Sequence, residues 1–186
     1  MELFPTLEIG WLNGWISLGL ICLTEGICFA TLPKDVVARL FDRSGWGKTQ
    51  VLFTVMGKMF SLACLVLVVL TPLRIGSSIF FIGTVLFALG LTGLIVALLD
   101  FKSTPPDQPV TTGLYKISRH PQLFTVFVAL LGACIAIGSW TALLMLVISR
   151  GLQHYGLLAE EEACLKQYGD SYRAYMERVP RYFLFF

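Results

Sequence analysis

The sequence predicts an all-α polytopic membrane protein with about five transmembrane helices. Of its 186 residues, 56% are hydrophobic and only 14% are charged, and the mean hydropathy is +0.75. Ordinary soluble domains carry about 25% charged residues. The apolar residues stand in blocks near the ~20 residues that a helix needs to cross the hydrocarbon core. We expect one integral membrane domain that covers residues 1–186.

The apolar blocks define the expected spans and their order. Pro33 ends the first block and Pro72 follows the second, because proline interrupts helical hydrogen bonding. A short interfacial helix is expected over residues 36–41. Only a small turn at Gly138 separates the last two blocks, which predicts a helical hairpin. The expected spans are residues 10–32, 50–70, 78–99, 122–137 and 140–158.

The positive charges predict an orientation. Eleven of the 14 Lys and Arg residues fall in the first connector, the third connector and the C-terminal segment, which share one side if five helices cross. Arg74 is the one basic residue expected on the other side. Cytoplasmic loops are enriched in Lys and Arg. The N-terminus is therefore expected outside and the polar C-terminal segment at the cytoplasmic face.

Several classes of function lack support in the sequence. No basic run with interleaved aromatic residues indicates nucleic-acid binding. No signal peptide is expected, since the first nine residues hold two glutamates and no Lys or Arg. The five cysteines form no CxxC pair, so neither a disulfide nor a metal site is expected. Nothing in the sequence indicates a protein partner.

Charged residues within the expected spans are costly there and so are candidates for function. Glu25 and Lys58 lie at similar expected depths, about 10–12 Å below the cytoplasmic face at 1.5 Å per residue. We expect them within ion-pair reach, as a structural pair or as part of a polar pocket. Arg150, His154 and Glu161 fall on one helical face, with either a structural or a ligand-binding role.

Two polar blocks at the cytoplasmic face are the candidate site. The first surrounds His120, one of two histidines in the chain, and precedes Pro121, a favoured residue in the first turn of a helix. The second runs over residues 160–181. Physical reasoning alone predicts a pocket for a zwitterion or an anion. The glycines Gly83, Gly90 and Gly93 are interpreted as close-packing residues of a membrane helix.

The two blocks resemble the isoprenylcysteine carboxyl methyltransferase superfamily of integral membrane enzymes. The first resembles its signature as Val110-Thr-Thr-Gly-Leu-Tyr-x3-Arg-His-Pro121. The second reads Glu160-Glu-x6-Tyr-Gly-x2-Tyr-x2-Tyr175-x5-Arg181, and the resemblance covers about residues 110–182. Where the family commonly has an aromatic residue after His-Pro, this chain has Gln122-Leu123, at the place where an acceptor would enter. The family's proline shortly after the terminal arginine is absent.

The resemblance implies a function and roles for residues. It implies methyl transfer from S-adenosylmethionine to a small lipophilic or membrane-embedded acceptor, with membrane lipid as surroundings and no metal. The acceptor and its nucleophilic atom stay open. The resemblance implies catalytic roles for Glu161 and Arg181. It implies that the cofactor is bound by Tyr115, Arg119, His120, Pro121, Glu160 and Tyr175.

Two other functions are alternatives to methyl transfer. A membrane reductase of the sterol-reductase type resembles the same C-terminal pattern and uses NADPH, but it usually carries Asn-Tyr after His-Pro. A non-enzymatic haem-binding or accessory membrane protein would use His120 and His154 as ligands. The two histidines suit that role in number, and no other feature of the sequence supports it.

Overall fold

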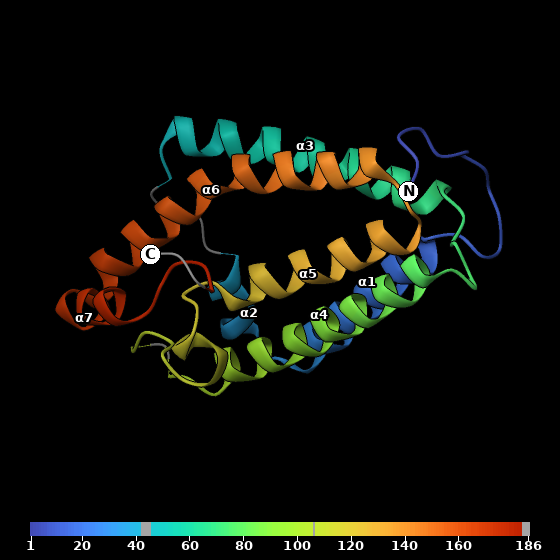
Figure 1. The fold of residues 1–186 in the computed structure, drawn as a ribbon. Helices are drawn as coiled ribbons and strands as arrows, with labels where there is room; N and C mark the ends of the chain where they lie inside the picture. The colour runs from blue at the N-terminus through green and yellow to red at the C-terminus, as the bar shows by residue number, and fades with distance from the viewer. Residues whose placement is uncertain (42–45, 106, 184–186) are drawn as a thin grey trace.

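The computed structural model describes residues 1–41, 46–105 and 107–183 and is built from helices (Figure 1). Among these residues there is no β-strand, and two isolated bridges tie Glu2 to Ser139 and Asn13 to Pro72. The all-α prediction is confirmed. The elements are α1 (Trp15–Thr31), α2 (Lys34–Leu40), α3 (Lys48–Leu70), α4 (Ser78–Lys102), the 3-10 helix η1 (Gly113–Lys116), α5 (Pro121–Ala136), α6 (Trp140–Tyr168) and α7 (Asp170–Arg178).

Three of the described helices, α3, α4 and α6, are long and apolar enough to cross a membrane. Helices α1 and α5 are apolar but shorter, with 17 and 16 residues. Large apolar side chains stand exposed along the helices, such as Met59, Phe81 and Val147. Extensive exposed apolar surface marks a membrane-facing protein. These features are consistent with an integral membrane protein, and crossing by α1 and α5 stays a prediction.

Helix ends follow the local sequence. A short helix, α2, is present where the interfacial helix was expected, and its place at the membrane interface stays a prediction; the expected first span begins later, at Trp15. Helix α6 continues ten residues beyond the predicted end at residue 158, because no Gly or Pro interrupts it after Gly156 until Gly169. Gly169 has a positive φ of 56°. The polar end of α6 therefore extends as a helix past its apolar part.

The helices pack in two close pairs. Helix α4 lies along α5, and α3 lies along α6 (Figure 1). The chain turns from α5 into α6 at Gly138, where φ is +70°, so the expected turn is present. After this turn α5 and α6 each pack mainly against a different helix. A buried core that includes Val68, Phe87 and Leu146 joins the two pairs.

Glycines allow the close approach of α4 and α5. A Cβ added to Gly83 would lie 2.5 Å from the Ala136 nitrogen, and one added to Gly90 would lie 2.3 Å from the Ala129 nitrogen. Real Cβ atoms do not approach backbone atoms so closely, and small residues are what membrane helices use for such contacts. The interpretation of Gly83, Gly90 and Gly93 as packing residues is confirmed; a Cβ at Gly93 would meet the Thr125 side chain at 2.6 Å.

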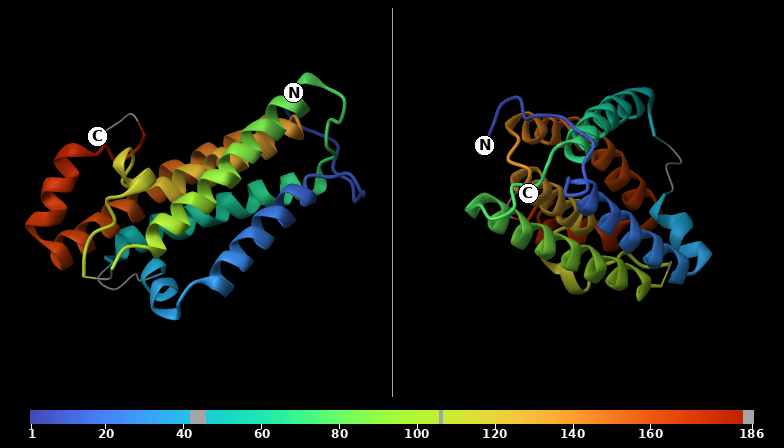
Figure 2. Two further views of the ribbon diagram at one scale, coloured as in Figure 1. Left: turned by 90° about the horizontal axis from the view of Figure 1, so that it is seen from below. Right: turned by 90° about the vertical axis from the view of Figure 1, so that its right-hand side faces the viewer.

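The polar connectors gather at one end of the bundle. Helices α2, η1 and α7 lie together at the left of Figure 1, whereas the turn after α3 and the turn after α5 lie at the opposite end. The view from below in Figure 2 agrees. The apolar helices hold the two polar blocks at the same end, as the charge pattern predicts.

The expected pair of Glu25 and Lys58 is wrong. Among the described residues no ion pair joins them; Lys58 is exposed on α3, and Glu25 lines a pocket together with residues of α4 and α5. Sequence spacing gives the depth of a residue along its helix. It does not give the direction in which the side chain points once the helices pack.

Candidate active site

The first polar block is held to the end of α4 by Asp100. The Leu114 backbone N–H donates to Asp100 Oδ2 at 2.8 Å. Gly113 precedes it with a φ of +56°, and a Cβ at Gly113 would lie 2.0 Å from the same carboxylate oxygen. Only glycine fits a left-handed position so close to the carboxylate. This contact fixes where η1 begins.

The C-terminal tail is bonded to the residues that precede α5. The Arg119 N–H donates to the Pro180 carbonyl at 3.0 Å. The Ser118 hydroxyl donates to the Arg181 carbonyl at 3.0 Å, and the His120 N–H donates to Ser118 Oγ at 3.2 Å. These bonds place His120 at the N-terminal boundary of α5, where Pro121 occupies the first turn. The tail therefore completes the site.

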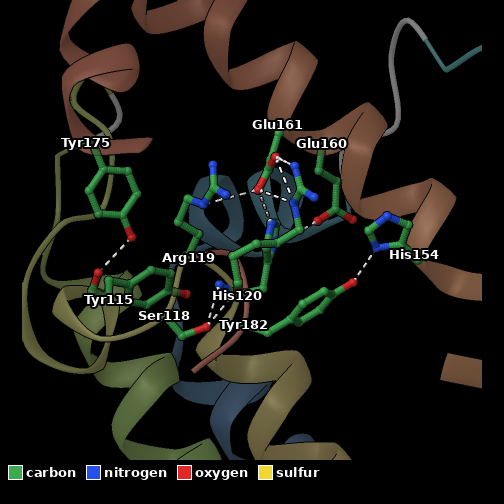
Figure 3. Close-up of polar contacts among 10 residues, drawn as sticks. Tyr115, Ser118, Arg119, His120, His154, Glu160, Glu161, Tyr175 and Tyr182 are labelled. Carbon is green, nitrogen blue, oxygen red and sulfur yellow. Dashed lines mark hydrogen bonds and ion pairs between the residues drawn. The ribbon is translucent and has the colours of Figure 1, made fainter. Parts of the chain in front are cut away.

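Glu161 is the centre of the polar contacts (Figure 3). Its side chain is buried, with 3% of the residue exposed. Arg181 donates to both carboxylate oxygens, from Nε at 3.0 and 3.1 Å and from Nη2 at 2.7 Å. His120 Nε2 lies 3.3 Å from Oε1. The hydrogen bond from Arg181 to Glu161 raises the pKa of Arg181. Such bidentate charged bonds hold both side chains in one geometry.

Arg119 lies on another side of the same carboxylate. Its Nε is 3.4 Å from Glu161 Oε1, which is within ion-pair distance, but the geometry is not that of a hydrogen bond. Arg119 is buried, with 7% of the residue exposed, and its Nε has no hydrogen-bond partner among the described residues. A buried donor without a partner is costly. Arg119 therefore has a donor whose hydrogen bond no described residue satisfies.

Glu160, the neighbour of Glu161, has a different environment. Its side chain is half exposed, and its Oε2 lies 3.8 Å from Nδ1 of His120. His120 thus stands between the two glutamates, with one ring nitrogen toward each (Figure 3). Glu160 lines the pocket described below, and Glu161 lies behind it as a support for the cationic side chains.

Three buried tyrosines connect α7 to η1. The Tyr175 hydroxyl donates to the Tyr115 carbonyl at 2.7 Å, and Tyr172 packs against Tyr175 with 5.7 Å between ring centroids. Burial raises the pKa of all three phenols well above the ordinary value of 10. They are neutral donors at physiological pH and cannot serve as bases there.

Arg150, His154 and Glu161, which were expected on one helical face, contact different partners. His154 Nδ1 is 2.5 Å from the Tyr182 hydroxyl of the tail. Arg150 donates to Gln153 at 3.4 Å within its own helix. Only Glu161 of the three contacts the residues around His120. Arg150 and His154 therefore have their hydrogen-bond partners within α6 and in the C-terminal tail.

A pocket of about 500 Å³ opens beside these residues. This volume lies within the range of small-molecule sites. Its polar end contains Arg119, His120 and Glu160, and Gln122 contributes a buried amide nitrogen without a partner among the described residues. Its apolar walls come from α1, α2, α4, α5 and α6 and include Phe29, Leu40, Leu94, Leu98, Leu123, Val126 and Leu157.

The structure brings most of the residues predicted from sequence to this pocket. Tyr115, Arg119, His120, Glu160 and Tyr175 line it. Glu161 and Arg181 contact Arg119 and His120 from behind, and Pro121 begins α5 beside them. The roles of these residues in binding or catalysis stay predictions.

Sequence reasoning missed other residues of the site. Asp100 was not singled out from the sequence; its only local signal is that it is the first charge after an apolar run. Ser118 and the backbone of Pro180 carried no signal, because they bond to residues distant in sequence: Ser118 bonds to Arg181, 63 positions away, and Pro180 accepts from Arg119. Gln122 was noted as a departure from the family pattern, and it lines the pocket.

Residues 98–171 match the family model described as phospholipid methyltransferase. This segment includes the last turn of α4, η1, α5, α6 and the beginning of α7. No curated protein and no solved structure matches the chain significantly. The match covers His120, Glu160 and Glu161, whereas Tyr175 and Arg181 lie beyond it. The resemblance to integral membrane methyltransferases is confirmed by this match, and the segment that builds most of the site is similar to the phospholipid methyltransferase family.

Proposed function

We propose that this protein transfers a methyl group from S-adenosylmethionine to a lipophilic acceptor that enters from the membrane. The observation that carries the proposal is one pocket with two ends of different chemistry. Arg119, His120 and Glu160 make one end polar, and leucines and aromatic residues of several helices line the rest. The family match supports methyl transfer as the reaction class.

The polar end fits the cofactor by its donors and acceptors. The buried Arg119 Nε and Gln122 Nε2 have no hydrogen-bond partner among the described residues, and both side chains line the pocket. They suit the carboxylate and hydroxyl oxygens of S-adenosylmethionine. Glu160 supplies a carboxylate for its ammonium or ribose hydroxyl groups, and Tyr115 and Tyr175 offer aromatic surface. Tyr175 and Pro121 would act mainly by fixing the shape of this end.

Methyl transfer requires little from the protein beyond alignment of the two reactants and exclusion of water. S-adenosylmethionine, when bound, supplies a methyl group on a positively charged sulfur for in-line displacement. The pocket residues would hold the reactants together, which replaces a bimolecular encounter. The apolar walls would exclude water, which strengthens the electrostatic interactions inside. No titration of the buried tyrosines is required, since they remain neutral donors.

Glu161 and Arg181, predicted as catalytic residues, are proposed to act through their neighbours. Arg181 donates three hydrogen bonds to Glu161, and Glu161 in turn contacts Arg119 and His120. Such a support keeps the pocket-lining cation and imidazole in fixed positions. We therefore assign Glu161 and Arg181 a positioning role in the proposed reaction.

Binding calorimetry on the purified full-length protein tests the proposal. S-adenosylhomocysteine should bind, and NADPH should not. Glu160→Gln and His120→Ala should each weaken that binding by roughly 1–3 kcal/mol, the cost of one hydrogen bond to a charged group. Glu162→Gln is the matched control, because Glu162 is exposed and pairs with Lys166 on the surface of α6.

Three results would count against the function. Unchanged affinity for S-adenosylhomocysteine in both Glu160→Gln and His120→Ala would place the cofactor elsewhere. Binding of NADPH without binding of S-adenosylhomocysteine would favour the reductase instead. A Soret absorbance band in the purified protein would favour the haem-binding alternative.

A further inference from the structure

The apolar part of the pocket contains one acidic side chain, Glu25 of α1. Glu25 lines the pocket together with Phe29, which stands one helical turn away on the same face, and with Leu94 and Val126. It lies six residues before the end of α1, about 9 Å along the helix axis at 1.5 Å per residue. Glu25 thus belongs to the membrane side of the pocket and to a segment outside residues 98–171.

Among the residues that the structure describes, Glu25 has no partner that would explain it as a structural residue. Its side chain is half buried. Across the described residues, Glu25 forms no ion pair or side-chain hydrogen bond. A carboxyl group at membrane depth is expensive without a partner. A group that enters the pocket can provide that partner.

The size of the pocket limits which part of an acceptor Glu25 can meet. About 500 Å³ must accommodate the polar end and the apolar end together, and a volume of this order suits one drug-sized ligand. An acceptor that shares the pocket with a cofactor inserts little more than its head group. The head group, and not a distant part of its tail, therefore lies near Glu25.

We propose that Glu25 selects the acceptor, and that the acceptor is a lipophile whose head group donates a hydrogen bond, such as an alcohol or an ammonium. This inference rests on the proposed methyl transfer. A donor head group satisfies the carboxyl oxygens of Glu25, and a charged pair of this kind is stronger than a neutral one. A carboxylate head group would place a second negative charge beside Glu25 and is disfavoured.

Three probes with one chain and different head groups test the selection: dodecanol, dodecylamine and dodecanoate. Binding is measured by calorimetry on the full-length protein with saturating S-adenosylhomocysteine. The wild type should bind dodecanol or dodecylamine at least about tenfold more tightly than dodecanoate, which is about 1.4 kcal/mol. Glu25→Ala should lose that preference. Glu25→Gln should keep the preference for dodecanol, because an amide oxygen still accepts, and lose a preference for dodecylamine.

The controls separate this inference from the proposed function. Glu162→Ala removes an exposed glutamate away from the pocket and should keep the wild-type order of affinities. The Glu25 variants should still bind S-adenosylhomocysteine, which shows that they fold and that the cofactor end is intact. The same preference in Glu25→Ala as in the wild type, tightest binding of dodecanoate, or binding of none of the probes would overturn the selection by Glu25. Loss of S-adenosylhomocysteine binding in the wild type would overturn the proposed function itself.

Discussion

Two neighbouring glutamates on α6 have opposite environments. Glu161 is buried and contacts His120, Arg119 and Arg181, whereas the side chain of Glu162 is 59% exposed and pairs with Lys166. Because the two residues are consecutive in the helix, their side chains project about 100° apart around its axis. The comparison of these two residues therefore isolates the contribution of the buried contacts.

Glu161→Gln is expected to destabilise the protein strongly. The substitution leaves the buried Arg119 and the partly buried Arg181 without this counter-charge, and loss of one partner of a buried pair costs about 3–5 kcal/mol. Glu162→Gln should change stability by less than about 1 kcal/mol, because exposed ion pairs contribute little. Thermal unfolding of both variants in one detergent provides the measurement. Equal melting temperatures for the two variants would contradict the buried role of Glu161.

Residue-level prediction from sequence succeeds where chemistry is local. The block around His120 and the Glu160-Glu161 pair predicted a polar site, because charged side chains between apolar helices cost free energy inside a membrane. The pairing of Arg181 with Glu161 joins residues 20 positions apart through a turn and α7. The path of that tail depends on hydrogen bonds that its carbonyls accept from the Ser118 hydroxyl and the Arg119 backbone N–H, which no local pattern encodes.

At the scale of elements, the contact of α4 with α5 depends on glycines. Gly90→Ala should force the two helices apart, since its Cβ would lie 2.3 Å from the Ala129 nitrogen. Overpacking of this kind costs typically about 1–3 kcal/mol. Gly26→Ala on α1 is the matched control, since its added Cβ would meet no atom within 4 Å. A melting temperature that falls only for Gly90→Ala is the expected result; a similar change in both would argue against close packing.

The elements themselves could be predicted more closely than their contacts. The apolar blocks predicted the ends of α3, α4 and α5 to within three residues. A long apolar run in a membrane must satisfy its backbone hydrogen bonds internally, and a helix does so. The hairpin of α5 and α6 was predicted from its short turn. That turn did not reveal that α4 and α3 would be the main packing partners, because the choice depends on the small residues that face each other.

At the scale of the whole molecule, orientation is the open prediction. The polar connectors gather at one end of the bundle, where Lys and Arg are concentrated. The positive-inside rule then predicts this end in the cytoplasm and the N-terminus outside. Single cysteines introduced at Arg74 and at Asp107 should react with impermeant reagents from opposite sides of the membrane. Reaction of both from the same side would exclude the five-span arrangement.

The length of α5 has a consequence for the membrane around the site. Its 16 residues reach about 24 Å, whereas the hydrocarbon core is about 30 Å thick. A short helix is accommodated by local thinning of the bilayer. His120 stands at the end of this helix, so thinning would draw the headgroup layer down toward the pocket entrance. The acyl-chain length of the membrane lipids sets the thickness of the bilayer. It would then control the distance between the lipid headgroups and the pocket entrance, and lipids with shorter chains should shorten that distance.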